Sequence, residues 1–109
     1  MEVLINTTPH EIYYLNTSNE IIFTLEKCLN PARIVEKVEE NGIIKHKKHY
    51  CIETKTTADI INLPEPENGV IYIVSKKVKE FCNHRLDLRV PSRINRINGK
   101  ILGCYSFGI

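Results

Sequence analysis

The sequence lacks a long apolar segment. Its longest unbroken apolar run, residues 70–74, has five residues, whereas a membrane-spanning helix needs about 20. The start of the chain also lacks the pattern of a signal peptide, because Glu2 stands where a basic region is expected and the apolar stretch ends at Ile5. We therefore expect a cytoplasmic protein with no membrane span.

The net charge is small, and the sequence lacks several motifs that would indicate a function. With 42% apolar residues, 26% charged residues and a net charge of +2, the chain does not have the composition of a disordered protein. It contains no zinc-finger spacing, no aromatic and glycine string typical of RNA-binding domains, and no glycine-rich phosphate loop. Its 109 residues fit one globular domain over residues 1–109, and nucleic acid is not the partner that we expect.

Four cysteines are present, but no two of them form a C-x-x-C pair. A disulfide framework requires a secretory context, which this sequence lacks. Each cysteine stands beside apolar residues, so we expect four free thiols that are buried as small hydrophobic side chains. They are Cys28, Cys51, Cys82 and Cys104.

The first 25 residues predict three short strands. Apolar residues 4–5 and 12–15 flank a turn-forming segment, residues 6–10, which contains a proline. A polar cluster at residues 16–19 then precedes a third apolar run, residues 21–25. The pattern predicts a β-meander.

The segment that follows Leu29 fits two structures. As a helix, it has Asn30 as a capping residue, a proline at the first helical position, and Gly42 to end it. As a hairpin, it has β-branched residues over residues 33–40 and an Asn41-Gly42 turn before a second strand from Ile43. Local rules do not decide between the two.

The second half of the chain predicts a buried strand followed by a short helix. After a proline-rich connector, the apolar run 70–74 is the candidate for a central strand that is covered on both faces. Ser75 is a suitable N-cap for a helix over residues 76–81, in which Val78 and Phe81 would point inward together.

The chain is predicted to end in a hairpin. Residues 86–90 favour a strand, and Asn98-Gly99 turns residues 93–97 back onto residues 100–105. The whole pattern predicts an α+β, predominantly β fold: a compact antiparallel or mixed sheet, or a small barrel, with one short helix after the central strand.

Positive charge is concentrated at the end of the chain. Residues 76–109 contain eight lysines and arginines and two acidic residues, so their net charge is +6. Because the whole chain has a net charge of +2, residues 1–75 have a net charge of −4. Such segregation indicates an anionic partner, or an oligomer in which a basic face meets an acidic one. The alternative is a solvated surface that folding mixes with acidic residues. Because the arginine guanidinium suits phosphate, a small phosphorylated ligand is the partner that we expect.

One group of candidate ligand-binding residues lies near the N-terminus. Asn6, Thr8 and His10 have a spacing of two, so they share a face if the strand continues through them. An amide, a hydroxyl and an imidazole together suit a ribose or a base edge. The alternative is that these side chains satisfy backbone groups in the turn and that His10 is a capped core histidine.

A second group follows the predicted central strand. Ser75 stands at a helix start, where backbone N–H groups favour anions, while Arg85, Asp87 and Arg89 come after the helix. We expect Ser75, Arg85 and Arg89 to contact phosphate and Asp87 to complete a polar wall. The two groups form one pocket if the strand end and the loop converge.

Metal and nucleophile chemistry have weaker support. His46, His49 and Cys51 are close in sequence, but on one continuous strand residues 46 and 49 face opposite ways, and no fourth ligand is evident. A cysteine nucleophile paired with His10 or His84 is a further possibility, since such partners meet in space rather than in sequence. We expect no metal and no cofactor.

Three segments resemble a group of small uncharacterised bacterial and phage-type proteins. They are the N-x-T-P-H opening (residues 6–10), the centre L-P-x-P followed by G-x-x-Y-I-V-S (residues 63–75), and the close G-x-x-x-G-C (residues 99–104). Arg85, Asp87 and a following proline fit the R-x-D…P part of the close, but the segment after that proline is basic where the group has an acidic one. The resemblance covers most of the chain, and it implies a mostly β fold, a strand over residues 33–40, and a phage or prophage context. It implies no activity.

These observations predict a non-enzymatic binding protein for a small anionic ligand, such as a nucleotide-derived signal, that acts by sequestration in phage counter-defence. The first alternative is an inhibitor that binds an acidic host protein through the basic C-terminal third, with Arg93 and Arg96 required. The second is a small hydrolase or transferase that uses His10 or His84. We also expect a homo-oligomer, because a domain of this size has few deep clefts and pockets often form at interfaces.

Overall fold

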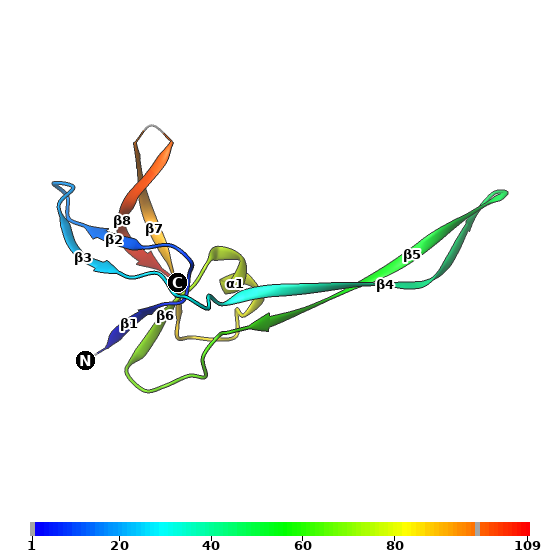
Figure 1. Cartoon of the computed structure of the whole chain (residues 1–109), viewed down its shortest axis with the longest axis horizontal. Coiled ribbons are helices and arrows are strands. Elements are labelled where there is room, and N and C mark those ends of the chain that lie inside the picture. The colour runs from blue at the N-terminus through cyan, green and yellow to red at the C-terminus, as the bar shows by residue number, and fades with distance from the viewer. Residues whose placement is uncertain (1, 98) are drawn as a thin grey trace.

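The computed structural model, described over residues 2–97 and 99–109, consists of a six-stranded mixed sheet, a separate two-stranded ribbon and one short helix (Figure 1). This confirms the predicted α+β, predominantly β class. The elements are β1 (Val3–Asn6), β2 (Ile12–Leu15), β3 (Ile21–Leu25), β4 (Arg33–His46), β5 (His49–Ile61), β6 (Val70–Ile73), α1 (Lys76–Phe81), β7 (Leu88–Ile97) and β8 (Lys100–Gly108). In the described part of the chain, no helix is both long and apolar enough to cross a bilayer.

The six-stranded sheet has the order β1-β6-β7-β8-β2-β3. Strands β1, β6 and β7 run parallel to one another, β7 and β8 form an antiparallel hairpin, and β8 pairs in parallel with β2, which pairs antiparallel with β3. The sheet curls so that its two edge strands, β1 and β3, approach each other. We call this sheet with its helix the body.

The predicted β-meander is wrong, because β1 pairs with β6 and not with β2. The reason lies in the segment that follows β1. Both the backbone N–H and the hydroxyl of Thr7 donate to the carbonyl of Ile73, at 2.9 and 2.8 Å, so the chain stays beside β6 beyond the end of the strand. A tight turn from β1 into β2 would break both bonds.

The predicted buried strand is confirmed as β6, which lies between β1 and β7. Ile73 and the next residue, Val74, are fully buried and pack into different apolar clusters. Leu88 at the start of β7 is buried beside Val74, so the core lies around the junction of β6, α1 and β7.

The short helix α1 begins where the sequence predicts. The Ser75 hydroxyl accepts a hydrogen bond from the backbone N–H of Val78 at 3.3 Å, and Val78 is buried. The prediction that Phe81 also points inward is wrong, because its side chain is 41% exposed. Cys82, four residues after Val78 and therefore on the same side of the helix, takes the inward position.

Strands β4 and β5 form a long antiparallel ribbon, residues 33–61, that projects from the body (Figure 1). We call it the arm. It gives the chain extents of 65 × 38 × 23 Å and a radius of gyration of 19.1 Å, compared with about 13 Å for a compact chain of this length. The predicted strand over residues 33–40 is confirmed, while the predicted compact sheet describes only the body.

The predicted hairpin turn at Asn41-Gly42 is wrong. Strand β4 continues through it to His46, the turn is formed by residues 47–48, and the register shifts by one residue between Glu40 and Gly42, as in a β-bulge. The longer pairing places Ile43 opposite Ile52, and such cross-strand apolar pairs stabilise a ribbon.

The predicted C-terminal hairpin is present as β7 and β8, although β7 begins at Leu88 rather than at residue 86. Asn98, the first residue of the predicted turn, lies outside the described residues. Arg93, within β7, has a positive φ of 51°.

The cysteines are free thiols, as predicted, but they are not equally covered. Cys82 and Cys104 are buried and Cys28 is half-buried. The prediction of burial is wrong for Cys51, which is exposed because it lies on the arm, beyond the residues of the ribbon that pack on the core.

Candidate functional site

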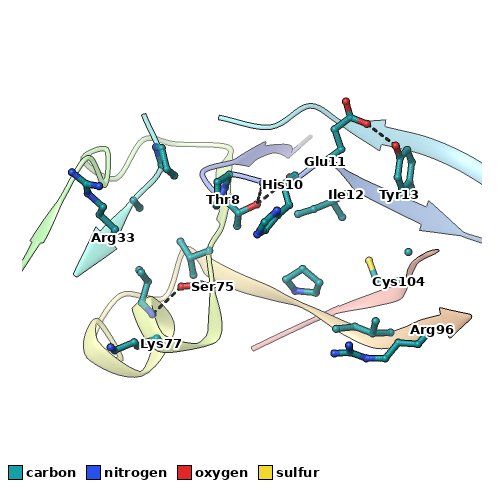
Figure 2. A pocket seen from close by; sticks show the side chains of 18 of the residues that line it. Thr8, His10, Glu11, Ile12, Tyr13, Arg33, Ser75, Lys77, Arg96 and Cys104 are labelled. Atoms are coloured by element: carbon teal, nitrogen blue, oxygen red, sulfur yellow. Dashed lines mark hydrogen bonds between the residues drawn. The ribbon is translucent and has the colours of Figure 1, made fainter. Parts of the chain in front are cut away.

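A groove of about 1010 Å³ lies where four parts of the chain meet. These are the loop after β1, the base of the arm, the start of α1 and the β7–β8 hairpin (Figure 2). Its floor is apolar and is formed by buried residues of the core, including Ile12, Val74, Val78 and Cys104. The groove therefore combines an apolar floor with polar side chains at its rim.

Three cationic side chains surround this floor. Arg33 comes from the start of β4, Lys77 from α1 and Arg96 from β7, and all three are exposed. Figure 2 shows Arg33 and Lys77 on one side of the groove, Arg96 on the other, and His10 between them. Among the described residues, none of the three cations forms an ion pair with a carboxylate. Positive charge at the rim is thus free to meet an anion.

One carboxylate, Glu11, also lines the rim. It accepts a hydrogen bond of 2.6 Å from the hydroxyl of Tyr13. This hydrogen bond to the Glu11 carboxylate raises the pKa of Tyr13 above its ordinary value. The Glu11–Tyr13 pair lies at the far edge of the groove from Arg33 and Lys77 (Figure 2).

Asn6 and Thr8 are buried and hold the loop that forms one wall of the groove. The Asn6 amide oxygen accepts from the backbone N–H and the hydroxyl of Thr8, at 2.9 and 2.7 Å. Its amide nitrogen donates to the carbonyls of His10 and Glu26, at 2.7 and 3.0 Å. Both side chains therefore bond to groups within and beside the turn, as expected from the alternative in which they satisfy its backbone and do not contact a ligand.

His10 differs from these two residues. Its side chain is exposed and lines the groove, so the interpretation as a core histidine is wrong. The bonds of Asn6 and Thr8 fix the backbone from which the imidazole projects. Of the N-terminal group, His10 is the residue with polar atoms available to a ligand.

Thr8, His10 and Ser75 meet at the groove, but Arg85, Asp87 and Arg89 do not line it. The Ser75 hydroxyl is used as the helix cap. Arg89 donates to the carbonyls of Leu86 and Leu88, both at 2.8 Å, so its guanidinium closes the loop that leads into β7.

Arg85 and Asp87 bind each other. Two hydrogen bonds, Nε to Oδ1 at 2.9 Å and Nη2 to Oδ2 at 2.7 Å, join them, and their side chains are only 13% and 19% exposed. The Arg85 guanidinium also lies over the ring of Tyr72, at 5.9 Å from its centre. The hydrogen bond from Arg85 lowers the pKa of Asp87, and the same bond raises the pKa of Arg85. This arrangement fastens the loop after α1 to β6.

Sequence reasoning did not identify Arg33 and Lys77 as ligand residues, and it named Arg96 only for a protein partner. One signal was available for Lys77: residues after the carboxyl ends of neighbouring parallel strands meet at one edge of a sheet. Once β1 and β6 are known to be parallel, the segments 7–10 and 74–77 are expected side by side. Arg33 carries no comparable signal, because its place depends on the whole path of the arm.

The candidates for nucleophile and metal chemistry are also placed by the structure. Burial raises the pKa of the Cys104 thiol above its ordinary value. His46 and His49 do not face opposite ways, as expected for one strand, but pair directly across the turn at the tip of the arm. Over residues 2–97 and 99–109, no three His, Cys, Asp or Glu side chains are grouped so as to hold a metal ion.

Comparison with protein-family models, with curated proteins and with solved structures finds no match to this chain. The resemblance of its three sequence segments to small phage-type proteins therefore stays a prediction.

Proposed function

We propose that this chain is a non-enzymatic binding protein that holds a small phosphorylated ligand in the groove. The observation that carries the proposal is the convergence of Arg33, Lys77 and Arg96, from three different elements, around one apolar floor without carboxylate partners among the described residues. Cations without partners at the rim of a concave site favour an anion, and arginine in particular favours the geometry of phosphate.

The two parts of the groove together favour a nucleotide as the ligand class. An apolar floor suits a flat base or another apolar group, while the rim suits the phosphates and His10 supplies a polar contact. The volume of about 1010 Å³ is at the upper end of ordinary small-molecule sites. It is large enough for a dinucleotide or a cyclic oligonucleotide.

Binding without turnover is supported by how the hydroxyl and thiol side chains of the groove are used. The hydroxyls of Thr8 and Ser75 are engaged in the loop and the helix cap, and the Cys104 thiol is buried with a raised pKa. A thiol must ionise to act as a nucleophile, so its environment disfavours that role. We infer that the ligand is sequestered rather than transformed.

Isothermal titration calorimetry and thermal shift against linear nucleotides, cyclic nucleotides and NAD-derived metabolites test this proposal. A ligand at about 100 times its dissociation constant stabilises the folded state by roughly 2.7 kcal/mol. We expect the substitution Arg96→Gln to weaken binding about 10- to 100-fold, since a hydrogen bond between charged groups contributes about 1.5–3 kcal/mol. The matched control is Arg93→Gln, an exposed arginine on the same strand that does not line the groove.

Two results would overturn the proposal. One is the absence of any stabilising ligand across the panel. The other is a ligand whose affinity is unchanged by Arg96→Gln and by Lys77→Gln. A salt-sensitive complex with an acidic host protein that requires both Arg93 and Arg96 would instead support the inhibitor alternative.

A further inference from the structure

The arm has two different faces, which its register defines. Residues that pair across a ribbon share a face, and successive pairs alternate between faces. On one face the pairs from base to tip are Ile34–Ile60, Glu36–Ala58, Val38–Thr56, Glu40–Thr54, Ile43–Ile52 and Lys45–Tyr50. We call it the apolar face. The opposite face carries most of the remaining charges, including the ion pair between Lys37 and Glu39.

The bulge between Glu40 and Gly42 keeps Ile43 on the apolar face. Without the extra residue, the register before the bulge would continue, so Gly42 would lie opposite Ile52 and Ile43 would lie on the opposite face, across from Cys51. With the bulge, Ile43 pairs with Ile52 on the same face as Ile34 and Val38. β-Bulges commonly redirect side chains in this way.

The apolar face packs on the core at its base, but farther out no described part of the chain covers it. Ile34 and Ile60 pack against the buried cluster of the body. Farther out, Val38, Ile43 and Ile52 are 62%, 68% and 65% exposed. An isolated two-stranded ribbon is at best marginally stable in water, and exposed apolar side chains that gather on one face of such a ribbon indicate an interaction surface.

We propose that the apolar face of the arm is covered by the same face of a second copy of this chain, with the two arms antiparallel about a two-fold axis. The distribution of charge on this face favours a second copy. Its acidic residues, Glu36 and Glu40, lie towards the base and middle, whereas Lys45 lies at the tip. In an antiparallel pair, the tip of each arm reaches the acidic stretch of the other, so the face is complementary to itself, as a two-fold interface requires.

The area of the apolar face is sufficient for a dimer interface. The part of the ribbon beyond Ile34–Ile60 is 11 residue pairs long and two strands wide, so it measures roughly 36 by 10 Å. Side-chain relief makes the accessible area larger than this flat projection, so two faces in contact bury on the order of 1,000 Å². Specific protein–protein interfaces begin at about that size. We therefore expect a dimer that dissociates on dilution.

Sedimentation equilibrium over a range of protein concentrations tests the proposal, and adjacent residues supply matched variants. Ile43 and Ile44 are neighbours on opposite faces of the arm, and both are more than half exposed. We expect the wild type to reach twice the 12.6 kDa chain mass at high concentration. Ile43→Asp should raise the dimer dissociation constant about tenfold or more, and Ile44→Asp should leave it near the wild-type value.

A second matched pair guards against failure of a single variant to fold. Ile52→Asp, on the apolar face, should have the effect of Ile43→Asp, whereas Cys51→Asp, on the opposite face, should resemble the wild type. Thermal unfolding of each variant shows whether the body remains intact. A charge reversal adds a specific signature: Lys45→Glu should weaken the dimer, and Lys45→Glu combined with Glu36→Lys and Glu40→Lys should restore it.

Three outcomes would overturn the proposal. The first is a wild-type chain that stays monomeric at every concentration. The second is equal weakening by the aspartate variants of both faces. The third is a dimer that all of these variants leave unchanged, which would place the interface elsewhere. None of these outcomes depends on the groove, so the proposed ligand-binding function can fail or succeed independently.

Discussion

Asn6 donates a hydrogen bond of 2.7 Å from its side-chain amide to the backbone carbonyl of His10. A buried residue thus fixes the backbone of the exposed histidine at the centre of the groove. Because the same amide also bonds to Thr8 and to the carbonyl of Glu26, Asn6 joins the end of β1 to two segments that follow it.

The substitution Asn6→Ala should lower the free energy of unfolding by about 1–3 kcal/mol, because it leaves several poorly solvated backbone groups without partners. Chemical denaturation measures this change. Asn16→Ala is the control, since Asn16 makes a similar set of bonds to Ser18 and Glu20 in an exposed turn and its loss should cost less than about 1 kcal/mol. Equal effects would contradict the role assigned to Asn6.

The ion pair between Arg85 and Asp87 is expected to stabilise the fold and not to bind ligand. Asp87→Asn keeps the shape of the side chain but removes its charge from a largely buried guanidinium, so we expect a loss of about 1–3 kcal/mol at pH 7. Ligand affinity in the groove should change less than about threefold. A large loss of affinity in a folded Asp87→Asn protein would instead indicate that Arg85 and Asp87 belong to the binding site.

The same pair gives the stability a defined dependence on pH. The pKa of Asp87 is lowered in the folded state, so its contribution is fully present above the unfolded value of about 3.9. It is lost as the pH falls through the lower folded value. The difference in unfolding free energy between the wild type and Asp87→Asn should therefore be constant from pH 7 to about pH 5 and shrink below about pH 4. A difference that stays constant down to pH 2 would show that the charge is not its source.

Gly103 lies on β8 next to the single residue pair that joins β8 to β2. A Cβ atom at this position would lie 2.6 Å from the carbonyl oxygen of Tyr13 and 3.0 Å from Cγ of Leu15, so Gly103→Ala must force the two strands apart. We expect a destabilisation of about 1–3 kcal/mol, measured by denaturant unfolding. Gly108→Ala, on the same strand, meets Ser92 and Val90 only at 3.5–3.8 Å and should be neutral or slightly stabilising.

The parts of the fold that the sequence predicts well are those that local signals determine. The apolar run of β6, the Ser75 cap of α1 and the C-terminal hairpin each have a short-range physical cause, and each is present. Local signals also misled where two of them competed. The Asn41-Gly42 pair favours a turn, but the register with 13 residues of β5 makes it a bulge instead.

The arrangement of the groove could not be predicted in the same way. It depends on the parallel pairing of β1 with β6, across a long stretch of chain, and no local pattern specifies such a pairing. Arginine residues illustrate the difficulty: Arg33 and Arg96 are far apart in the sequence, yet both line the groove, whereas Arg85 binds Asp87 outside it. The charge of a residue is visible in the sequence, whereas its place in the fold is not.

The two ends of the arm leave the body at neighbouring points, since Arg33 pairs with Ile61 and the amide of Asn62 donates to the carbonyl of Pro31 at 3.4 Å. This has a consequence for the order of folding. The arm contains only pairings within one hairpin, which form quickly. Strands β1 and β6 are far apart in the chain, so their pairing requires the closure of a long loop and a correspondingly large loss of entropy. Once the hairpin has formed, it brings residues 32 and 62 together and shortens the loop that must close. We expect a truncated arm that no longer forms a hairpin to slow the folding of the body, even though the body contains none of the arm's outer residues.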